Sequence, residues 1–285
     1  MEKFDCNRLL KEYALSCIEN YLLYLISQKK YQWKTIYCKS FMPFKNILKE
    51  LYGGIGYSHF KGVKRLQDIA MEQGCSTLEY LDNVDNLSDI ENEYYAIQVT
   101  NKYMCEKYNY KPWRRDHYIL LHNKMNCSVV EYLNDVPMDS GQMLFEDANK
   151  ICDGVVILFN VKDNVNVDLD RAINNARLCI DKFGFNDTQI EWNNLTFEIA
   201  RDAVSISKVL VKRQIEFIKL FDNKFDEVNY YRYLTSIQTK LEYMRLKKID
   251  ISRCNDIMKE VLIYDDKYYK KVTEILNRNV PNVLI

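Results

Sequence analysis

The chain has 285 residues, with 40 basic and 40 acidic side chains, so its formal net charge is zero. Hydrophobic residues make up 47% and charged residues 28%, a balance typical of a folded globular protein. The even charge argues against nucleic acid as the main ligand, because phosphate binding needs an excess of basic charge. No apolar stretch is long enough to span a membrane and no secretory signal opens the sequence, so we expect a cytoplasmic protein.

The residues that could bind metals or form disulfides are few or widely scattered. The nine cysteines form no CxxC pair, and they stand at positions 6, 17, 38, 75, 105, 127, 152, 179 and 254. Neither a disulfide framework nor a metal site is expected from this spacing, and no bound cofactor is expected either. Only His59, His117 and His122 can supply an imidazole. Chemistry that needs histidine therefore has a short candidate list.

The first part of the chain mixes helical and strand patterns. Apolar residues recur at helical spacing over residues 16–28, a glycine-bearing segment follows at 53–62, and a second helix is predicted over 64–74. Strands are predicted over four further runs, at residues 93–100, 117–122, 127–134 and 155–161. A hairpin loop at 122–126 would join the second and third of these strands.

From residue 165 onward the pattern is helical, with helices predicted over 200–221, 230–249 and 257–276. We therefore expect an α+β fold in two domains. Residues 1–164 would form the domain that contains the sheet, and residues 165–285 would form an α-helical domain.

Cys17 is the first candidate for chemistry. Ser16 and Glu19 have the S-x-x-E spacing of a capping box, which would place Cys17 at the first position of a helix. Unpaired backbone N–H groups and the helix dipole both stabilise a thiolate there, so we expect a lowered pKa and a nucleophilic thiol. The alternative is a core cysteine in the middle of a helix. Cys6 is a weaker candidate, because the Glu or Gln partner of a capping box is missing there.

His117 opens an apolar strand, and the strand after it ends in Asn134 and Asp135. If His122 pairs with Cys127, His117 lies opposite Tyr132 and shares a face with Asn134, whereas a slip of one residue brings Asp135 there. Either side chain could orient the imidazole as the third member of a Cys–His–Asp/Asn triad. Both remain candidates, and we favour Asp135.

Trp113, Arg114 and Arg115 stand just before His117, and Tyr118 follows it. These four residues are candidates for substrate contacts, since the two cations could bind an anionic group. The alternative for the cationic part of this segment is a solvated loop.

The segments SCIENYLLYLI, EYYAIQVTNKYM and DHYILLHNKMNCSVVEYLNDVP resemble the butirosin-type acyltransferase family. The chain also resembles the amide synthetase of closthioamide assembly. This resemblance implies a papain-like cysteine-protease fold with Cys17, His117 and Asp135 (or Asn134) as the catalytic residues. It also implies an acyl or peptidyl carrier protein as acyl donor, a small amine as acceptor, and a role in peptide-type antibiotic biosynthesis.

Two other interpretations stay open at this point. Bacteriocin-processing cysteine peptidases have the same triad order, so a peptidase or hydrolase is the first alternative. A non-catalytic binding protein is the second. Neither the acyl group, the amine nor the oligomeric state follows from the sequence, and a homodimer is among the options.

Overall fold

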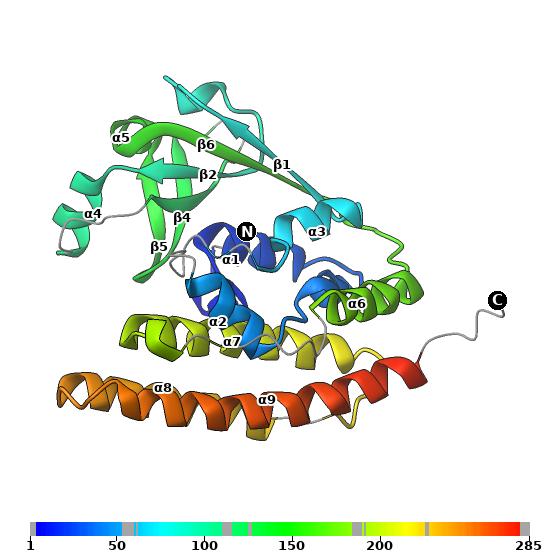
Figure 1. Cartoon of the computed structure of the whole chain (residues 1–285). Helices are drawn as coiled ribbons and strands as arrows, with labels where there is room; N and C mark the ends of the chain where they lie inside the picture. Colours follow the sequence, from blue (N-terminus) through cyan, green and yellow to red (C-terminus); the bar gives the residue numbers. More distant parts are fainter. Residues whose placement is uncertain are drawn as a thin grey trace. The chain divides into compact units, whose positions relative to one another are not determined.

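The chain forms a mixed α+β structure that divides into two compact units (Figure 1). This computed structural model describes residues 4–52, 60, 62–109, 116–124, 127–183, 190, 192–225 and 228–279. Unit 1 comprises Met1–Tyr31 and Ala70–Val165, and unit 2 comprises Gln32–Ile69 and Asn166–Ile285. The break near residue 165 lies close to the predicted one.

Residues 32–69 differ from the predicted domains, because they group with the C-terminal helices and not with the sheet. This segment contains the 3₁₀-helix η3 (Trp33–Lys39) and the helix α2 (Phe44–Tyr52). α2 buries Phe44, Ile47, Leu48 and Leu51 on one side. Since apolar residues at this spacing make one stripe on a helix, α2 needs a helical partner, and it packs on the helix α7 (Phe197–Ile218).

Unit 1 contains a six-stranded antiparallel sheet in the order β1-β6-β2-β3-β4-β5. The strands are β1 (Ser76–Leu81), β2 (Tyr94–Val99), β3 (His117–His122), β4 (Val129–Asp135), β5 (Met138–Leu144) and β6 (Cys152–Val161). All four predicted strands are present. The more polar β1 and β5 were not predicted, and both lie at the edges of the sheet, where one side of a strand stays open.

The register between β3 and β4 is neither of the two considered from the sequence. His122 pairs with Glu131 rather than Cys127, and Leu120 pairs with Leu133. The connection is longer than a tight hairpin, because the backbone N–H of Cys127 bonds to the carbonyl of Lys124 and β4 begins only at Val129. Residues 125 and 126 of the predicted loop lie outside the described part of the chain.

The two faces of the sheet are covered differently. Alternate residues of four strands, among them Tyr95, Ile119, Val130 and Val156, form one core. Met104 of the helix α4 (Asn101–Tyr108) and Ala148 of the helix α5 (Phe145–Ile151) complete it. The helix α1 (Cys17–Ile26) packs against β3 and β6. Nine of its ten residues are buried, the polar Glu19 and Asn20 among them, so α1 is a central helix of unit 1.

Shorter helices complete unit 1. They are η1 (Cys6–Arg8), η2 (Lys11–Tyr13), η5 (Leu87–Asp89), α4 (Asn101–Tyr108) and α5 (Phe145–Ile151). The helix α3 (Leu66–Glu72) lies at the boundary between the units in the sequence. Lys107 of α4 binds the hydroxyl of Tyr132 at 2.8 Å and the carboxylate of Asp139 at 3.1 Å, which attaches this helix to β4 and β5.

Unit 2 is helical. Besides η3 and α2, its elements are α6 (Leu169–Phe183), η6 (Trp192–Asn194), α7 (Phe197–Ile218), α8 (Val228–Leu246) and α9 (Ser252–Arg278). The three predicted long helices correspond to α7, α8 and α9, which pack on one another (Figure 1). Asp265 of α9 accepts a hydrogen bond from the backbone N–H of Phe44 at 2.7 Å, so α9 holds the first residue of α2.

Candidate functional site

Cys17 is the first residue of α1, as the capping-box pattern predicts. Ser16 is the N-cap, with extended backbone angles, and its Oγ accepts a hydrogen bond from the N–H of Glu19 at 3.2 Å. The carboxylate of Glu19 reaches back and accepts from the N–H of Leu15 at 2.7 Å, one residue before the N-cap. The local sequence thus determines the position of the thiol at the helix N-terminus.

Cys17 is partly exposed, and its thiol lies among polar groups of α1, β3 and β4. Burial, and after it the negative charge of Asp135, together raise its pKa to about 12. Backbone hydrogen bonds from Tyr118, Ile18 and Cys17 itself act in the opposite direction. The expected lowering of the pKa is therefore wrong: the N–H groups are in place, but desolvation and a nearby carboxylate outweigh them.

His117 opens β3 and is buried, with 5% of its surface exposed. Its Nε2 donates a hydrogen bond to Oδ1 of Asn134 at 2.6 Å, which leaves Nδ1 on the other side of the ring. Asn134, one of the two candidates for the third member of the triad, thus contacts the imidazole through a hydrogen bond. With β3 and β4 in the observed register, His117 and Asn134 share a face of the sheet.

Asp135 is a second buried group at the same place. It accepts hydrogen bonds from Nδ2 of Asn20 at 3.3 Å and from the hydroxyl of Tyr21 at 3.4 Å. Burial raises the pKa of this carboxyl, while the charge of His117 and the hydrogen bonds from Asn20 and Tyr21 lower it. Asp135 is therefore bonded to two side chains of α1. Its charge also acts on the thiol of Cys17 and on the imidazole of His117.

These groups gather where β3 and β4 separate. Pairing between the two strands ends at Leu120 and Leu133, short of the first residues of β3 and the last residues of β4. The hydroxyl of Tyr21 donates to the carbonyl of Tyr118 at 2.7 Å, and the backbone of Tyr118 also bonds to the thiol of Cys17. Side chains of α1 thus form hydrogen bonds with backbone groups of β3 beyond the point where its pairing with β4 ends.

Two buried amide atoms at this place have no hydrogen-bond partner among the described residues. They are Nδ2 of Asn134 and Oδ1 of Asn20. Buried polar atoms are nearly always paired in native proteins, so unpaired atoms require an explanation such as a binding or catalytic role. Both belong to residues that contact His117 or Asp135.

The other predicted site residues fall into two groups. Tyr118 is partly buried, its hydroxyl donates to Oε1 of Gln98 at 3.4 Å, and burial raises its pKa to about 12. Trp113, Arg114 and Arg115 lie outside the described residues, as does His59. Among the described residues, no group of histidine, cysteine and acidic side chains could hold a metal ion.

Sequence reasoning missed Asn20 and Tyr21. They stand three and four residues after Cys17, so they lie above it on the same side of a helix. An amide within a mostly apolar helix was the available signal, because a buried amide needs a partner. Asp135 is that partner.

Neither a family model, a curated protein nor a solved structure matches this chain. Within the described residues, no helix is both long and apolar enough to cross a membrane. The chemistry of the site is therefore argued from its own geometry.

Proposed function

We propose that the chain is a cysteine-dependent acyltransferase of papain-like fold that forms an amide bond. The observation that carries this proposal is the hydrogen-bonded pair of His117 and Asn134, joined to the thiol of Cys17 through Asp135 and the backbone of Tyr118. A nucleophile, a base and a residue that orients the base are the parts that covalent acyl transfer requires.

In the proposed cycle, Asn134 orients the ring of His117 through Nε2, and Nδ1 takes the proton of Cys17. A thiol with a pKa near 12 is neutral at pH 7, so proton transfer accompanies the attack on the carbonyl. The sulfur of Cys17 displaces the carrier thiolate from a thioester and forms an acyl-cysteine, and the departing thiolate takes the proton from His117. Backbone N–H groups at the start of α1 stabilise the oxyanion, an effect typically worth about 3 kcal/mol per donor.

An amine then attacks the acyl-cysteine, loses its proton to His117, and releases the amide and the free thiol. The donor in this proposal is an acyl or peptidyl carrier protein with a phosphopantetheine thioester, in the cytoplasm. The acyl carbon has the same oxidation level in the thioester and in the amide, so the proposed reaction uses neither a redox partner nor a bound cofactor.

Acyl transfer to Cys17 is tested by intact-mass spectrometry after incubation with an acyl N-acetylcysteamine thioester. We expect the wild-type chain to gain one acyl group, Cys17→Ala to gain none, and Cys6→Ala to behave like the wild type. His117→Ala and Asn134→Ala should slow acylation by about 100-fold or more, because they remove the base or its orientation. If Cys17→Ala still gains the acyl group on another residue, Cys17 is not the nucleophile.

The fate of the acyl group distinguishes a transferase from a hydrolase. With a diamine present, a transferase releases mainly the amide, whereas a peptidase or hydrolase releases the free acid with or without the amine. A wild-type chain that takes up no acyl group from the thioester would contradict both, and would favour a non-catalytic binding protein.

A further inference from the structure

The helix α9 (Ser252–Arg278), orange to red in Figure 1, has an outward side as well as a buried one. Its buried residues run from Cys254 to Leu276, and it packs on α2, α6, α7 and α8 of unit 2. On the opposite side, exposed residues follow at alternating spacings of four and three, at positions 256, 260, 263, 267, 270 and 274. Residues at this spacing form one stripe along a helix, and two helices pack on one another through such stripes. We call these residues the outer stripe of α9.

The middle of the outer stripe is apolar. Ile263 is 57% exposed and the adjacent Tyr264 is 48% exposed, although both side chains are large and hydrophobic. The ring of Tyr264 stacks on Tyr233 of α8 with 4.1 Å between the ring centroids, and the ammonium of Lys267 lies 5.7 Å from the centre of the Tyr264 ring. An apolar centre within a charged rim is the usual composition of a protein–protein interface.

The exposed charges of α9 change sign about this centre. Each charge before Ile263 has a charge of opposite sign at nearly the same distance after it. The four pairs are Arg253 with Glu274, Asp256 with Lys270, Lys259 with Asp266, and Glu260 with Lys267. Lys271, the remaining exposed charge of this span, also corresponds to Asp256. The helix is therefore complementary in charge to an antiparallel copy of itself.

Contacts within the chain leave these charges accessible to a partner. Lys259 lies 3.4 Å from Asp256, in an ion pair whose side chains are 54% and 79% exposed, and exposed pairs of this kind are weak. Glu260 and Lys270 form no ion pair with another residue in the part of the chain that the structure describes. The whole chain has a formal net charge of zero, so two copies do not repel one another at long range.

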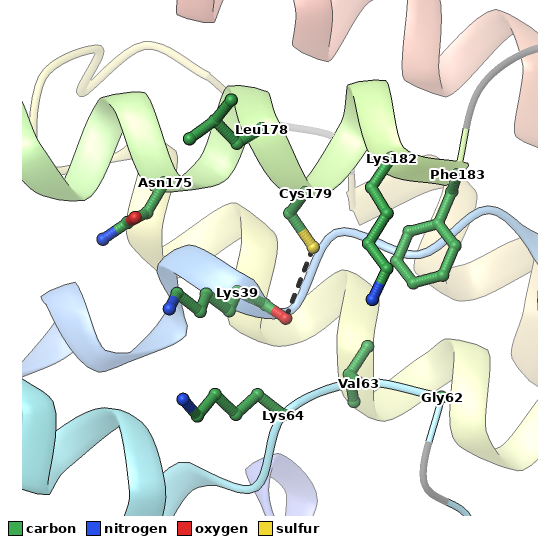
Figure 2. Close-up of a pocket in the computed structure, with 9 residues that line it drawn as sticks. All are labelled: Lys39, Gly62, Val63, Lys64, Asn175, Leu178, Cys179, Lys182 and Phe183. Atoms are coloured by element: carbon green, nitrogen blue, oxygen red, sulfur yellow. Dashed lines mark hydrogen bonds between the residues drawn. The ribbon is translucent and has the colours of Figure 1, made fainter.

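The outer stripe does not border the cavity of unit 2. This cavity has a volume of about 290 Å³, and its wall comes from η3, from α6 and from the segment between α2 and α3 (Figure 2). None of its described lining residues belongs to α9. Small-molecule sites are concave, whereas the outward side of a single helix is convex, so the stripe suits another protein surface.

We infer that the chain forms a dimer in which the outer stripes of two α9 helices pack antiparallel about a two-fold axis at Ile263. The two Ile263 side chains then meet at the axis, and each of the four charge pairs forms twice, once on either side of it. Since each protomer contributes mainly one helix, the interface is small, and we expect the dimer to dissociate at low concentration and at high salt. The inference does not depend on the proposed acyl transfer.

Sedimentation velocity on the full chain, at about 5 to 500 µM and low salt, tests this inference. We expect the wild type to shift from monomer to dimer over this range, and to return toward monomer in about 0.5 M NaCl. Glu260→Lys places a cation opposite Lys267 of the partner and should weaken dimerisation by about tenfold or more, as should Lys267→Glu by placing two anions together. Mixed in equal amounts, these two variants should associate with each other, because opposite charges then face at both symmetry-related contacts.

Ile263→Asp removes the apolar centre and should abolish the dimer at the same concentrations. Glu106→Lys makes the charge change of Glu260→Lys on an exposed surface of unit 1 and should leave dimerisation unchanged. All of these positions are exposed, so circular dichroism should show an unchanged fold.

Three results would each overturn the inference. They are a wild type that stays monomeric at about 500 µM in low salt, an unchanged dimer in Glu260→Lys or Ile263→Asp, and no association in the mixture of the two charge variants. Cys17→Ala should dimerise like the wild type, so a failure of the proposed acyl transfer is measured separately.

Discussion

At the scale of single residues, the environment of Cys17 decides how its thiol can react. The helix N-terminus supplies N–H groups, but burial and the carboxylate of Asp135 raise the pKa of the thiol to about 12. A group whose charged form is disfavoured this strongly does not form a resting thiolate near pH 7. Any nucleophilic role then depends on His117 as a base during the reaction.

This environment predicts the reactivity of Cys17 toward iodoacetamide. At about pH 7 we expect Cys17 to be labelled more slowly than the exposed Cys127, and its rate should keep rising up to about pH 10 because the thiolate fraction grows with pH. Asp135→Asn removes a negative charge and should speed the labelling of Cys17 at a given pH. Peptide mapping by mass spectrometry measures both rates. Faster labelling of Cys17 than of Cys127 at pH 7 would mean that the thiol is ionised after all.

At the scale of elements, α1 positions the candidate site. Its N-terminus is determined by the cap of Ser16 and Glu19, and its buried face packs on β3 and β6. Asn20 and Tyr21 extend from the same helix to the ends of β4 and β3. A change at the first turn of α1 therefore affects both stability and the position of the thiol.

Ser16→Ala should lower the free energy of unfolding by about 1 kcal/mol, since the N–H of Glu19 loses its side-chain acceptor. Ser16→Thr keeps a hydroxyl at the N-cap and should retain most of the stability. Urea unfolding followed by circular dichroism measures the difference. An equal loss in the two variants would show that the hydroxyl does not act as a cap.

At the scale of the whole molecule, buried ionisable groups couple stability to pH. Asp265 of unit 2 is 3% exposed, and it accepts hydrogen bonds from the N–H of Phe44 and the hydroxyl of Tyr230, each at 2.7 Å. Burial raises its pKa to about 7, although both hydrogen bonds lower it. The folded state therefore keeps this carboxyl protonated up to a higher pH than the unfolded chain does.

The sign of the pH dependence follows from this difference. Between the ordinary carboxyl pKa of about 4 and the folded value of about 7, the folded state binds more protons, so this group's contribution to stability falls as pH rises. Urea midpoints should decrease across this range, and the decrease should be smaller in Asp265→Asn. Asp256→Asn, at an exposed position of the same helix, is the matched control. An unchanged slope in Asp265→Asn would assign the pH dependence to other groups.

Much of the local structure follows from the sequence because it depends on neighbouring residues. The capping box places Cys17 at the start of α1, and the apolar runs around His117 and in the last 100 or so residues predict strands and long helices that the structure contains. β1 and β5 escaped prediction, because edge strands are partly solvated and lack a clear apolar pattern.

Three properties were decided only by the tertiary structure, because each depends on groups distant in sequence. The register of β3 against β4 places His117 and Asn134 on one face of the sheet, where the two side chains form a hydrogen bond. The pKa of Cys17 reverses its expected direction, since desolvation and a carboxylate 118 residues away outweigh the helix N-terminus. Residues 32–69 join the helical unit because their apolar side fits α7, a contact that local pattern cannot specify.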